Sequence, residues 1–158
     1  MKRLHLLLMI SLSVVMADSY ATGKTVSAIG HYDCNNVFAK ILDGKLPATK
    51  IYEDDHVLAF NDIRPLRPVH ILVIPKGKYR SLVDFSAKAS DVEIAALVRA
   101  LGKVANIAKV EQSGFSIMSN SGHDGGQTVP HLHFHLLGGT KVHWEEALLQ
   151  QQIKHKAD

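Results

Sequence analysis

Three histidines alternate with apolar residues late in the chain, at His131, His133 and His135. In an extended strand, residues two apart point to the same face, so this spacing predicts that the three imidazoles share one surface. Neighbouring rings would then lie about 7 Å apart along the strand, close enough for one phosphate group to meet more than one ring. We therefore interpret the histidines as the centre of a site for a small anionic ligand.

Imidazole is suited to attack on a phosphorus atom. The neutral ring is a nucleophile, and its ordinary pKa of about 6.5 leaves it largely deprotonated at neutral pH, while a neighbouring imidazolium would stabilise the departing group. The preceding residues Gly125, Gly126, Gln127 and Thr128 offer backbone N–H groups and a hydroxyl for the phosphate oxygens. The glycine-rich loop and the histidines are thus predicted to form one cradle.

A zinc hydrolase is the main alternative for the same residues, because three imidazoles with an open fourth position resemble a hydrolytic zinc centre. On one strand, however, the outer two histidines would lie about 13 Å apart, and all three cannot reach a zinc ion at about 2.0 Å without a bulge. We therefore expect no metal and no other cofactor. His31, His56 and His123 are expected to have no catalytic role.

The elements that must position these groups follow from apolar periodicity. Asn35 or Asn36 is expected to cap a short helix, and Ser90 with Glu93 forms a capping box before a long helix with one apolar stripe that ends near Ala108. The segments predicted as strands are 50–52, 57–60, 70–74, 115–119 and 129–137. We expect an α+β domain, with an antiparallel sheet of about five strands and one long and one short helix packed on it.

The N-terminal segment, residues 1–21, has the layout of a signal peptide: a basic start followed by a short apolar run over residues 6–17. That run is shorter than the roughly 20 residues that span a bilayer, so we expect export to the periplasm or the medium and no stable membrane anchor. The alternative is a cytoplasmic protein whose translation starts at Met16. The remaining divisions are expected to be a flexible segment at 22–34, the domain at 35–144 and a C-terminal tail at 145–158.

Charge and cysteine content argue against a protein that binds long nucleic acid and against a fold held by intramolecular disulfides. The formal net charge is +3 and no Lys/Arg cluster is present, whereas a protein that binds long nucleic acid usually neutralises several phosphates with a basic face. Cys34 is the only cysteine, so no intramolecular disulfide can form.

The segment HLHFHLLGG at 131–139 resembles the signature of the histidine-triad (HIT) nucleotide-binding superfamily, and residues 36–76 and 120–139 are similar to its Hint branch. The resemblance implies hydrolysis of purine nucleoside phosphoramidates or related AMP conjugates, in which His133 attacks the α-phosphorus and water hydrolyses the nucleotidyl-histidine. It also implies a homodimer in which Trp144 reaches the partner's site.

The resemblance assigns a role to each site residue. His135 would lie on the phosphate and leaving-group side, His131 would orient His133 through its backbone carbonyl, and His70 would support the triad from a neighbouring strand. The residues implied around the nucleotide are Asp62 at the ribose, Ile63, Val37, Phe38 and Ile41 around the purine base, and Asn120, Gly126, Gln127 and Thr128 around the phosphate.

The sequence is also compatible with several alternatives. The protein could be a dinucleoside polyphosphate hydrolase of the same superfamily, or a nucleotide-binding regulatory protein without turnover. Asp62 could cap a turn, and Phe38 and Ile41 could be core residues. Many bacterial relatives carry Cys-x-x-Cys where this chain has Asn36 and Ala39, which implies that their structural zinc is missing here. In the loop, threonine stands at position 128, where serine is usual.

Overall fold

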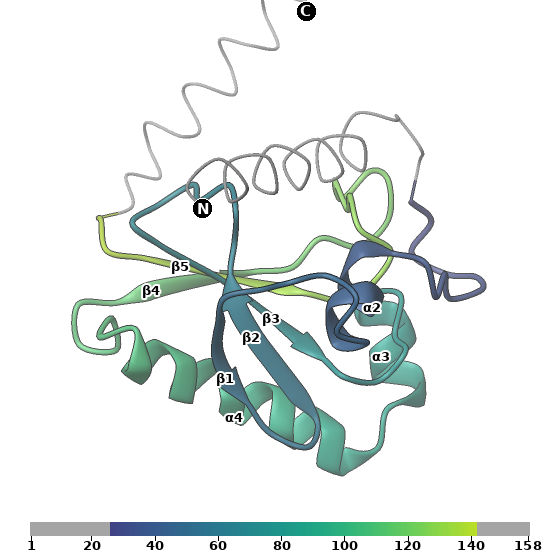
Figure 1. The fold of residues 1–158 in the computed structure, drawn as a ribbon, viewed down its shortest axis with the longest axis horizontal. Coiled ribbons are helices and arrows are strands. Elements are labelled where there is room, and N and C mark those ends of the chain that lie inside the picture. Colours follow the sequence, from purple (N-terminus) through teal and green to yellow (C-terminus); the bar gives the residue numbers. More distant parts are fainter. Residues whose placement is uncertain (1–25, 142–158) are drawn as a thin grey trace, which may run out of the picture.

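The computed structural model describes residues 26–141, in which five strands form one antiparallel sheet (Figure 1). The strands lie in the spatial order β1-β2-β3-β5-β4. Their bounds are Lys50–Glu53 for β1, Val57–Asn61 for β2, Val69–Pro75 for β3, Phe115–Met118 for β4 and Phe134–Gly138 for β5. The helices are α2 (Val37–Leu42), α3 (Leu82–Lys88) and α4 (Asp91–Ile107). The predicted α+β class and antiparallel sheet are confirmed.

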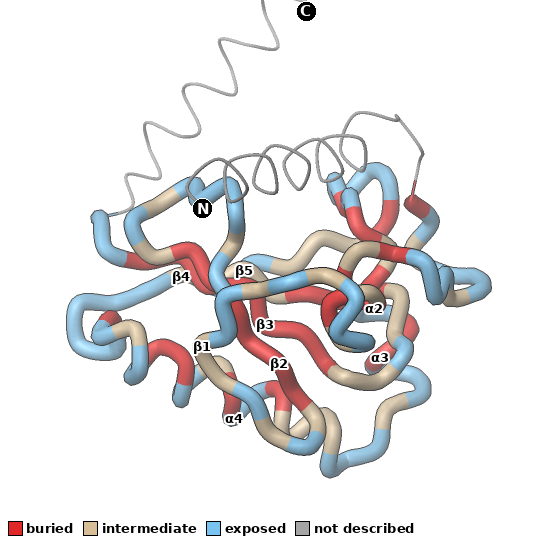
Figure 2. The backbone as a smooth tube through the Cα atoms, in the orientation of Figure 1, coloured by how far each residue is buried: buried red, intermediate tan, exposed pale blue. Residues whose placement is uncertain are grey.

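The central strand β3 is apolar and almost completely buried, and it separates the β1–β2 hairpin from β5 and β4 (Figure 2). In its register with β5, His70 pairs with Leu137, and Leu72 pairs with His135. His70 and His135 are therefore diagonal neighbours on one face of the sheet, although they are far apart in sequence.

Side chains along the strands alternate between two cores. Val57 and Ala59 of β2 face the long helix α4, whose buried stripe includes Leu97 and Val104. The intervening residue Leu58 belongs to a second core with the short helix α2. The sheet therefore has α4 on one face and α2 on the other (Figure 1). The diagonal pair of histidines lies on the α2 face, because His70 alternates with Ile71, which belongs to the α4 core.

Local hydrogen bonds fix the helix starts. The Asn36 side chain accepts from the amides of Phe38 and Ala39, both at 2.9 Å, so asparagine at this position caps α2. The capping box of Ser90 and Glu93 at the start of α4 is also confirmed.

Besides the predicted long and short helices, the fold contains one further helix, α3, which the sequence pattern does not indicate. It is short, and its first turn depends on the Ser81 hydroxyl, which accepts from the Asp84 amide. Its single deeply buried apolar residue, Phe85, packs in the α4 core. One apolar anchor in seven residues leaves no helical period to detect in the sequence.

The last strand is shorter than predicted, because residues 129–133 leave the sheet. Pro130 has no amide to donate, the His131 amide donates to the Val129 carbonyl at 2.8 Å, and the Leu132 amide donates to the Tyr79 carbonyl at 2.7 Å. These bonds replace the ladder bonds of a strand, so β5 begins only at Phe134. His131 and His133 therefore precede the strand, and only His135 lies on it.

Residues 26–34 pack against the domain, in contrast to the expected flexible segment at 22–34. Arg80 donates through Nη1 to the His31 carbonyl at 2.6 Å, and the Ser81 hydroxyl donates to the Ala28 carbonyl at 2.6 Å. Val26 is buried. The packed part of the chain thus starts before the expected boundary at Asn35.

The expected signal peptide at 1–21, the C-terminal tail at 145–158 and Trp144 lie outside the described residues, so export and the role of Trp144 stay predictions. Within residues 26–141, no helix has the length and apolar character needed to cross a membrane.

The α4 core should dominate stability. Leu97 is 2% exposed and its neighbour Val98 is 64% exposed. We expect Leu97→Ala to lower the free energy of unfolding by about 2–5 kcal/mol, because it removes buried methyl groups and leaves a cavity. Val98→Ala is the matched control and should change it by less than about 0.5 kcal/mol. If urea denaturation showed that both variants lower the free energy of unfolding equally, this packing of α4 would be contradicted.

Candidate active site

His133 is held in one tautomer by its own chain. Its Nδ1 lies 2.7 Å from the carbonyl oxygen of His131, which only accepts, so Nδ1 carries the proton. The lone pair is therefore on Nε2, which has no hydrogen-bond partner among the described residues. Because every fully buried side-chain nitrogen or oxygen atom in residues 26–141 has a partner, this unpaired atom is reached by solvent. The side chain of His133 is thus almost completely buried, and the small part of it that solvent reaches includes a neutral, unshared lone pair.

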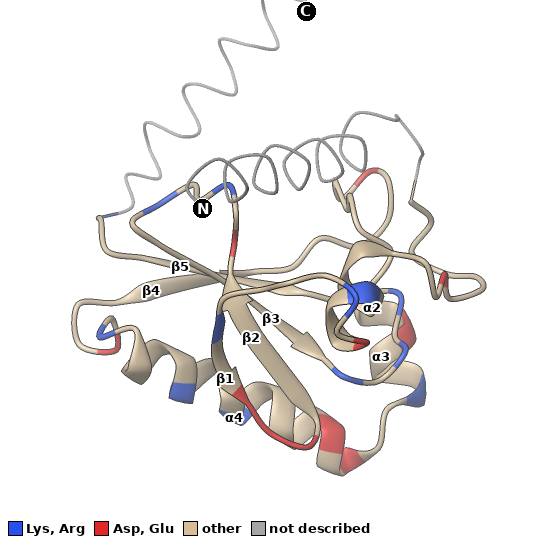
Figure 3. Cartoon of the chain, viewed as in Figure 1, with Lys and Arg blue, Asp and Glu red and all other residues tan. Residues whose placement is uncertain are grey.

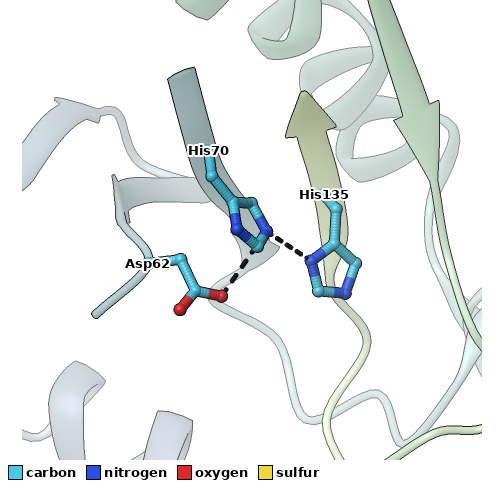
Figure 4. Close-up of side chains that lie close together, drawn as sticks. All are labelled: Asp62, His70 and His135. Carbon is cyan, nitrogen blue, oxygen red and sulfur yellow. Dashed lines mark hydrogen bonds and ion pairs between the residues drawn. The ribbon is translucent and has the colours of Figure 1, made fainter. Parts of the chain in front are cut away.

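His70 and His135 form a second oriented pair (Figure 4). The Leu66 amide donates to His70 Nδ1 at 3.1 Å, which leaves the proton of the neutral His70 ring on Nε2. That nitrogen lies 2.8 Å from His135 Nδ1 and donates to it. His135 therefore carries its own proton on Nε2, and its ring lies 5.0 Å from that of His133. A lone pair on His133 and an N–H donor on His135 stand side by side.

Asp62 supports this pair from the end of β2. Its Oδ1 accepts from the Arg64 amide at 2.7 Å, so the turn-capping alternative is present in the structure. Its other oxygen, Oδ2, lies 3.5 Å from His70 Nε2 (Figure 4). The carboxylate therefore caps a turn with one oxygen and faces the histidine pair with the other.

His131 differs from the prediction. Its ring is completely buried, with Nε2 at 2.9 Å from the Pro75 carbonyl and Nδ1 against the hydroxyl of Tyr32. The expectation that all three imidazoles share one open surface was wrong for His131, because this residue precedes β5 and lies outside the alternation of that strand. Its backbone carbonyl, rather than its ring, contacts His133.

Burial keeps the histidines neutral. It lowers the pKa of His131 to about 4, and together with the neighbouring rings of His133 and His70 it lowers the pKa of His135 to about 4. Burial also lowers the pKa of His133, against the smaller opposing effects of the His131 carbonyl and Asp62. The expected imidazolium beside His133 is therefore not present in the structure, where His135 is a neutral donor.

Burial likewise lowers the pKa of His70, while the carboxylate of Asp62 and the backbone of Arg64 act in the opposite direction. His70 is therefore the ring with the closest opposite charge, and the place in the pair where an added proton is best compensated.

An apolar cleft adjoins the histidines on the α2 side of the sheet. Val37, Phe38, Ile41, Asp62 and Ile63 all line it, so the predicted base-binding set lies together. Phe38 and Ile41 are also buried in the second core, which means that their core role and their position at the cleft coexist. The Phe38 ring lies 5.2 Å from that of His133 and joins the cleft to the histidines.

Several groups of the loop at 120–128 that were expected to bind phosphate instead form hydrogen bonds within the protein. The Gln127 side chain donates to the Arg80 carbonyl at 2.7 Å and to the Val129 carbonyl at 2.9 Å, and it accepts from the Gly122 amide at 2.9 Å. The amides of Gly126 and Gln127 donate within the loop. Gln127 can therefore reach a ligand only by giving up one of these bonds.

The two remaining residues of the predicted phosphate set differ from each other. The Asn120 side chain donates to the Gly125 carbonyl and closes the loop. Thr128 is exposed, and within the described part of the chain its amide and hydroxyl make no hydrogen bond. Of this set, Thr128 is the residue whose polar groups are open to a ligand.

Formal charge plays little part at the centre of the site. Strands β2, β3, β4 and β5 contain no Lys, Arg, Asp or Glu, and the charged residues lie on β1, the helices and the loops (Figure 3). An anionic group at the histidines would therefore meet imidazole and backbone donors rather than a cluster of basic side chains.

Asp62, His70 and His135 form a group whose possible metal-ligating atoms lie within 4.8 Å of one another. This group differs from the three alternating histidines that suggested a zinc centre. A metal ion bound through His70 Nε2 would displace the proton that the Leu66 amide fixes there, together with the hydrogen bond to His135. Hydrogen bonds thus complete the arrangement of Asp62, His70 and His135.

Sequence reasoning missed Tyr32 and the backbone groups of Leu66 and Pro75. Pro75 marked the end of a strand, but nothing in the sequence indicated that its carbonyl meets His131. Tyr32 had no periodic signal, because it lies in an irregular segment before the first helix. Contacts of this kind depend on chain closure over long sequence separations.

These observations define a class of protein, namely an α+β domain in which an antiparallel sheet holds oriented neutral histidines beside an apolar cleft. The sequence model of the HIT domain matches residues 43–142. The chain belongs to the HIT domain family.

Individual relatives agree with this assignment. An uncharacterised 13.2 kDa HIT-like protein of Azospirillum brasilense is 53% identical over 111 residues, which are 70% of this chain and 91% of the relative. Adenylylsulfatase HINT1 of Arabidopsis thaliana is 43% identical over 114 residues, which are 71% of this chain and 76% of the relative. A histidine triad protein from Clostridium difficile has a similar structure, with a TM-score of 0.62 and 44% identity over 73% of this chain and 97% of its own.

The lowered histidine pKa values predict a dependence of stability on pH. Unfolding returns the rings to an ordinary pKa of about 6.5, so between about pH 6.5 and 5 the unfolded chain binds protons that the folded chain does not. The free energy of unfolding should therefore fall as the pH decreases through this range, which lies above the titration of ordinary carboxyl groups, and should be nearly constant above about pH 7.

Urea denaturation at each pH measures this effect. The variant His135→Gln lacks one of the two rings whose pKa is about 4, so its stability should depend less steeply on pH by at most one proton. A wild-type stability that does not change between about pH 6.5 and 5 would contradict the buried, neutral state of the histidines.

Proposed function

We propose that the protein hydrolyses purine nucleoside phosphoramidates or related AMP conjugates through a nucleotidyl intermediate on His133. The observation that carries this proposal is the unpaired Nε2 of His133, whose lone pair is fixed by the bond from Nδ1 to the His131 carbonyl and is open to solvent. A neutral imidazole nitrogen in this state needs no deprotonation before it attacks phosphorus.

In the first step, His133 Nε2 forms a bond to the α-phosphorus and the bond to the leaving group breaks. Binding of an anionic phosphate favours one additional proton on the His70–His135 pair, which His70 Nδ1 takes up in place of the hydrogen bond from the Leu66 amide, with Asp62 beside the ring. His135 Nε2 then gives a proton to the leaving nitrogen, and the pair returns to neutrality. The leaving group therefore departs as a neutral amine rather than as an amide anion, and His135 acts as the general acid.

In the second step, water attacks the phosphorus of the nucleotidyl-histidine. The neutral His135 accepts one proton from that water, the bond between phosphorus and His133 Nε2 breaks, and the nucleoside monophosphate leaves. His133 regains its neutral form, because the proton on Nδ1 stays there throughout and is donated to the His131 carbonyl. Release of the product removes the anion that favoured the extra proton on the pair.

The cleft supports a nucleoside as the other half of the substrate. Phe38 and Ile41 provide apolar surface for a flat base, and Ile63 lies exposed at the edge. The Asp62 carboxylate has acceptor capacity left for ribose hydroxyls beside its bond to Arg64. The name of the Arabidopsis relative, adenylylsulfatase, describes action on an AMP conjugate, which agrees with this substrate class.

Replacing the nucleophile tests the proposal. We expect His133→Ala to lower kcat for adenosine phosphoramidate by at least about 1,000-fold, because the covalent route is lost. Mass spectrometry of rapidly acid-quenched wild-type reactions should place a nucleotidyl group on His133. The exposed His123 is the matched control, since its side chain lies outside this site, and His123→Ala should retain wild-type kcat.

Three results would count against the mechanism. Equal rates for wild type and His133→Ala would remove the catalytic role of His133, and an adduct on another residue would replace it as the nucleophile. Loss of all turnover after exhaustive chelation, with recovery on adding zinc, would favour the metal alternative.

We further propose that the protein is a homodimer paired through β4. This strand lies at the edge of the described sheet, and its apolar residues Phe115, Ile117 and Met118 are 38%, 37% and 41% exposed. An edge strand with unpaired backbone groups and apolar side chains favours pairing with another strand.

A charge on this edge should separate the subunits. We expect Ile117→Asp to shift the protein from dimer to monomer in sedimentation velocity at micromolar concentration, because a buried carboxylate would be unpaired. Val98→Asp on the exposed face of α4 should leave the dimer intact. A monomeric wild type, or dissociation by both substitutions, would contradict an interface at β4.

A further inference from the structure

We propose that Tyr32 is a positioning residue, which holds the ring of His131 and thereby fixes the carbonyl that orients His133. This inference rests on the proposed function, because it adds one residue to the mechanism of the same site. Tyr32 precedes the region matched by the HIT domain, residues 43–142, and is not among the residues that line the cleft.

The contact between Tyr32 and His131 is specific. The phenol oxygen lies 2.5 Å from His131 Nδ1, and the two rings meet edge to face with their centroids 5.6 Å apart. The Tyr32 side chain is half-buried, whereas His131 is completely buried. Tyr32 therefore closes the outer side of a histidine that has no access to water.

The direction of this bond follows from the other nitrogen of the ring. His131 Nε2 lies 2.9 Å from the Pro75 carbonyl, which only accepts, so the proton of the neutral ring is on Nε2. Nδ1 is then an acceptor, and the Tyr32 hydroxyl donates to it. Removing the hydroxyl would leave a buried acceptor without a partner, a loss that a small shift of the ring or entry of water must compensate.

A shift of the His131 ring would change the orientation of His133. The backbone carbonyl of His131 accepts from His133 Nδ1, so any movement of residue 131 changes the angle at which His133 Nε2 meets a phosphorus atom. Phe38 packs edge-on against both rings, at 6.1 Å from His131 and 5.2 Å from His133. The two histidines are thus held as one unit.

The segment that carries Tyr32 is attached to the same part of the domain that holds His131. Arg80 donates to the carbonyls of Ser27 and His31, at 2.5 and 2.6 Å. Arg80 follows β3 closely, and β3 ends at Pro75, the second partner of His131. Tyr32 and Pro75 therefore hold the ring from opposite nitrogens while both are tied to the end of β3.

The test compares Tyr32→Phe with wild type in the full chain, using adenosine phosphoramidate as substrate. We expect kcat to fall roughly 3- to 10-fold with KM within about twofold, because alignment changes and the nucleotide contacts do not. The ¹⁵N resonance of His131 Nδ1 should move toward the value of a ring nitrogen without a hydrogen bond, while the Nε2–H tautomer persists. Tyr52→Phe is the matched control, since the Tyr52 hydroxyl bonds Asp54 and Lys103 away from the site.

A double-mutant cycle tests whether Tyr32 affects kcat through the ring of His131. In a His131→Asn background, Tyr32→Phe should have no further effect on kcat, because the atom through which it acts is gone. An equal fall of kcat in both backgrounds would overturn the inference, as would an active wild type whose kcat and His131 resonance are both unchanged by Tyr32→Phe. A wild type without any turnover would instead refute the proposed function.

If Tyr32→Phe does not fold, wild-type NMR alone decides. The Tyr32 hydroxyl proton should exchange slowly with water and show a nuclear Overhauser contact to the His131 ring. A rapidly exchanging hydroxyl, or a His131 Nδ1 resonance typical of a nitrogen without a hydrogen bond, would overturn the assignment.

Discussion

The hydrogen bond from His133 Nδ1 to the His131 carbonyl is the interaction on which the rest of the site depends. It fixes the lone pair of His133 on Nε2, and it requires a backbone that folds away from regular strand geometry just before β5. Pro130, with no amide to donate, and the diverted amides of His131 and Leu132 produce that geometry. The departure from the sheet is therefore part of how the ring of His133 is oriented.

The remaining hydrogen bonds leave two ring nitrogens open. The Pro75 carbonyl and Tyr32 engage both nitrogens of His131, while Leu66 and His135 engage those of His70. Burial lowers the pKa values of these rings and keeps them neutral. What stays available is the lone pair of His133 and the Nε2–H group of His135, which are the two groups that the proposed mechanism uses as nucleophile and general acid.

The sheet makes this arrangement possible because one of its faces carries the main apolar core and the other carries the site. Its α4 face is packed with apolar side chains, and its opposite face carries α2, the apolar cleft and the diagonal pair His70 and His135. Because strands β2 to β5 lack formal charges, the lowered pKa values arise mainly from burial. The same apolar surroundings that hold the fold together therefore keep the rings neutral.

The sequence by itself determined the features that depend on near neighbours. Short apolar runs bounded by turn residues predicted the strands of the sheet, the Ser90–Glu93 pair predicted the start of α4, and Asn36 was correctly one of two candidate caps for α2. Only the tertiary structure decided how the histidines differ. The partners of His131 lie 56 and 99 residues away in sequence, and His70 lies 65 residues from His135. Periodicity and caps reflect interactions within a few residues, whereas these tautomers are set by groups that meet only after the chain has closed.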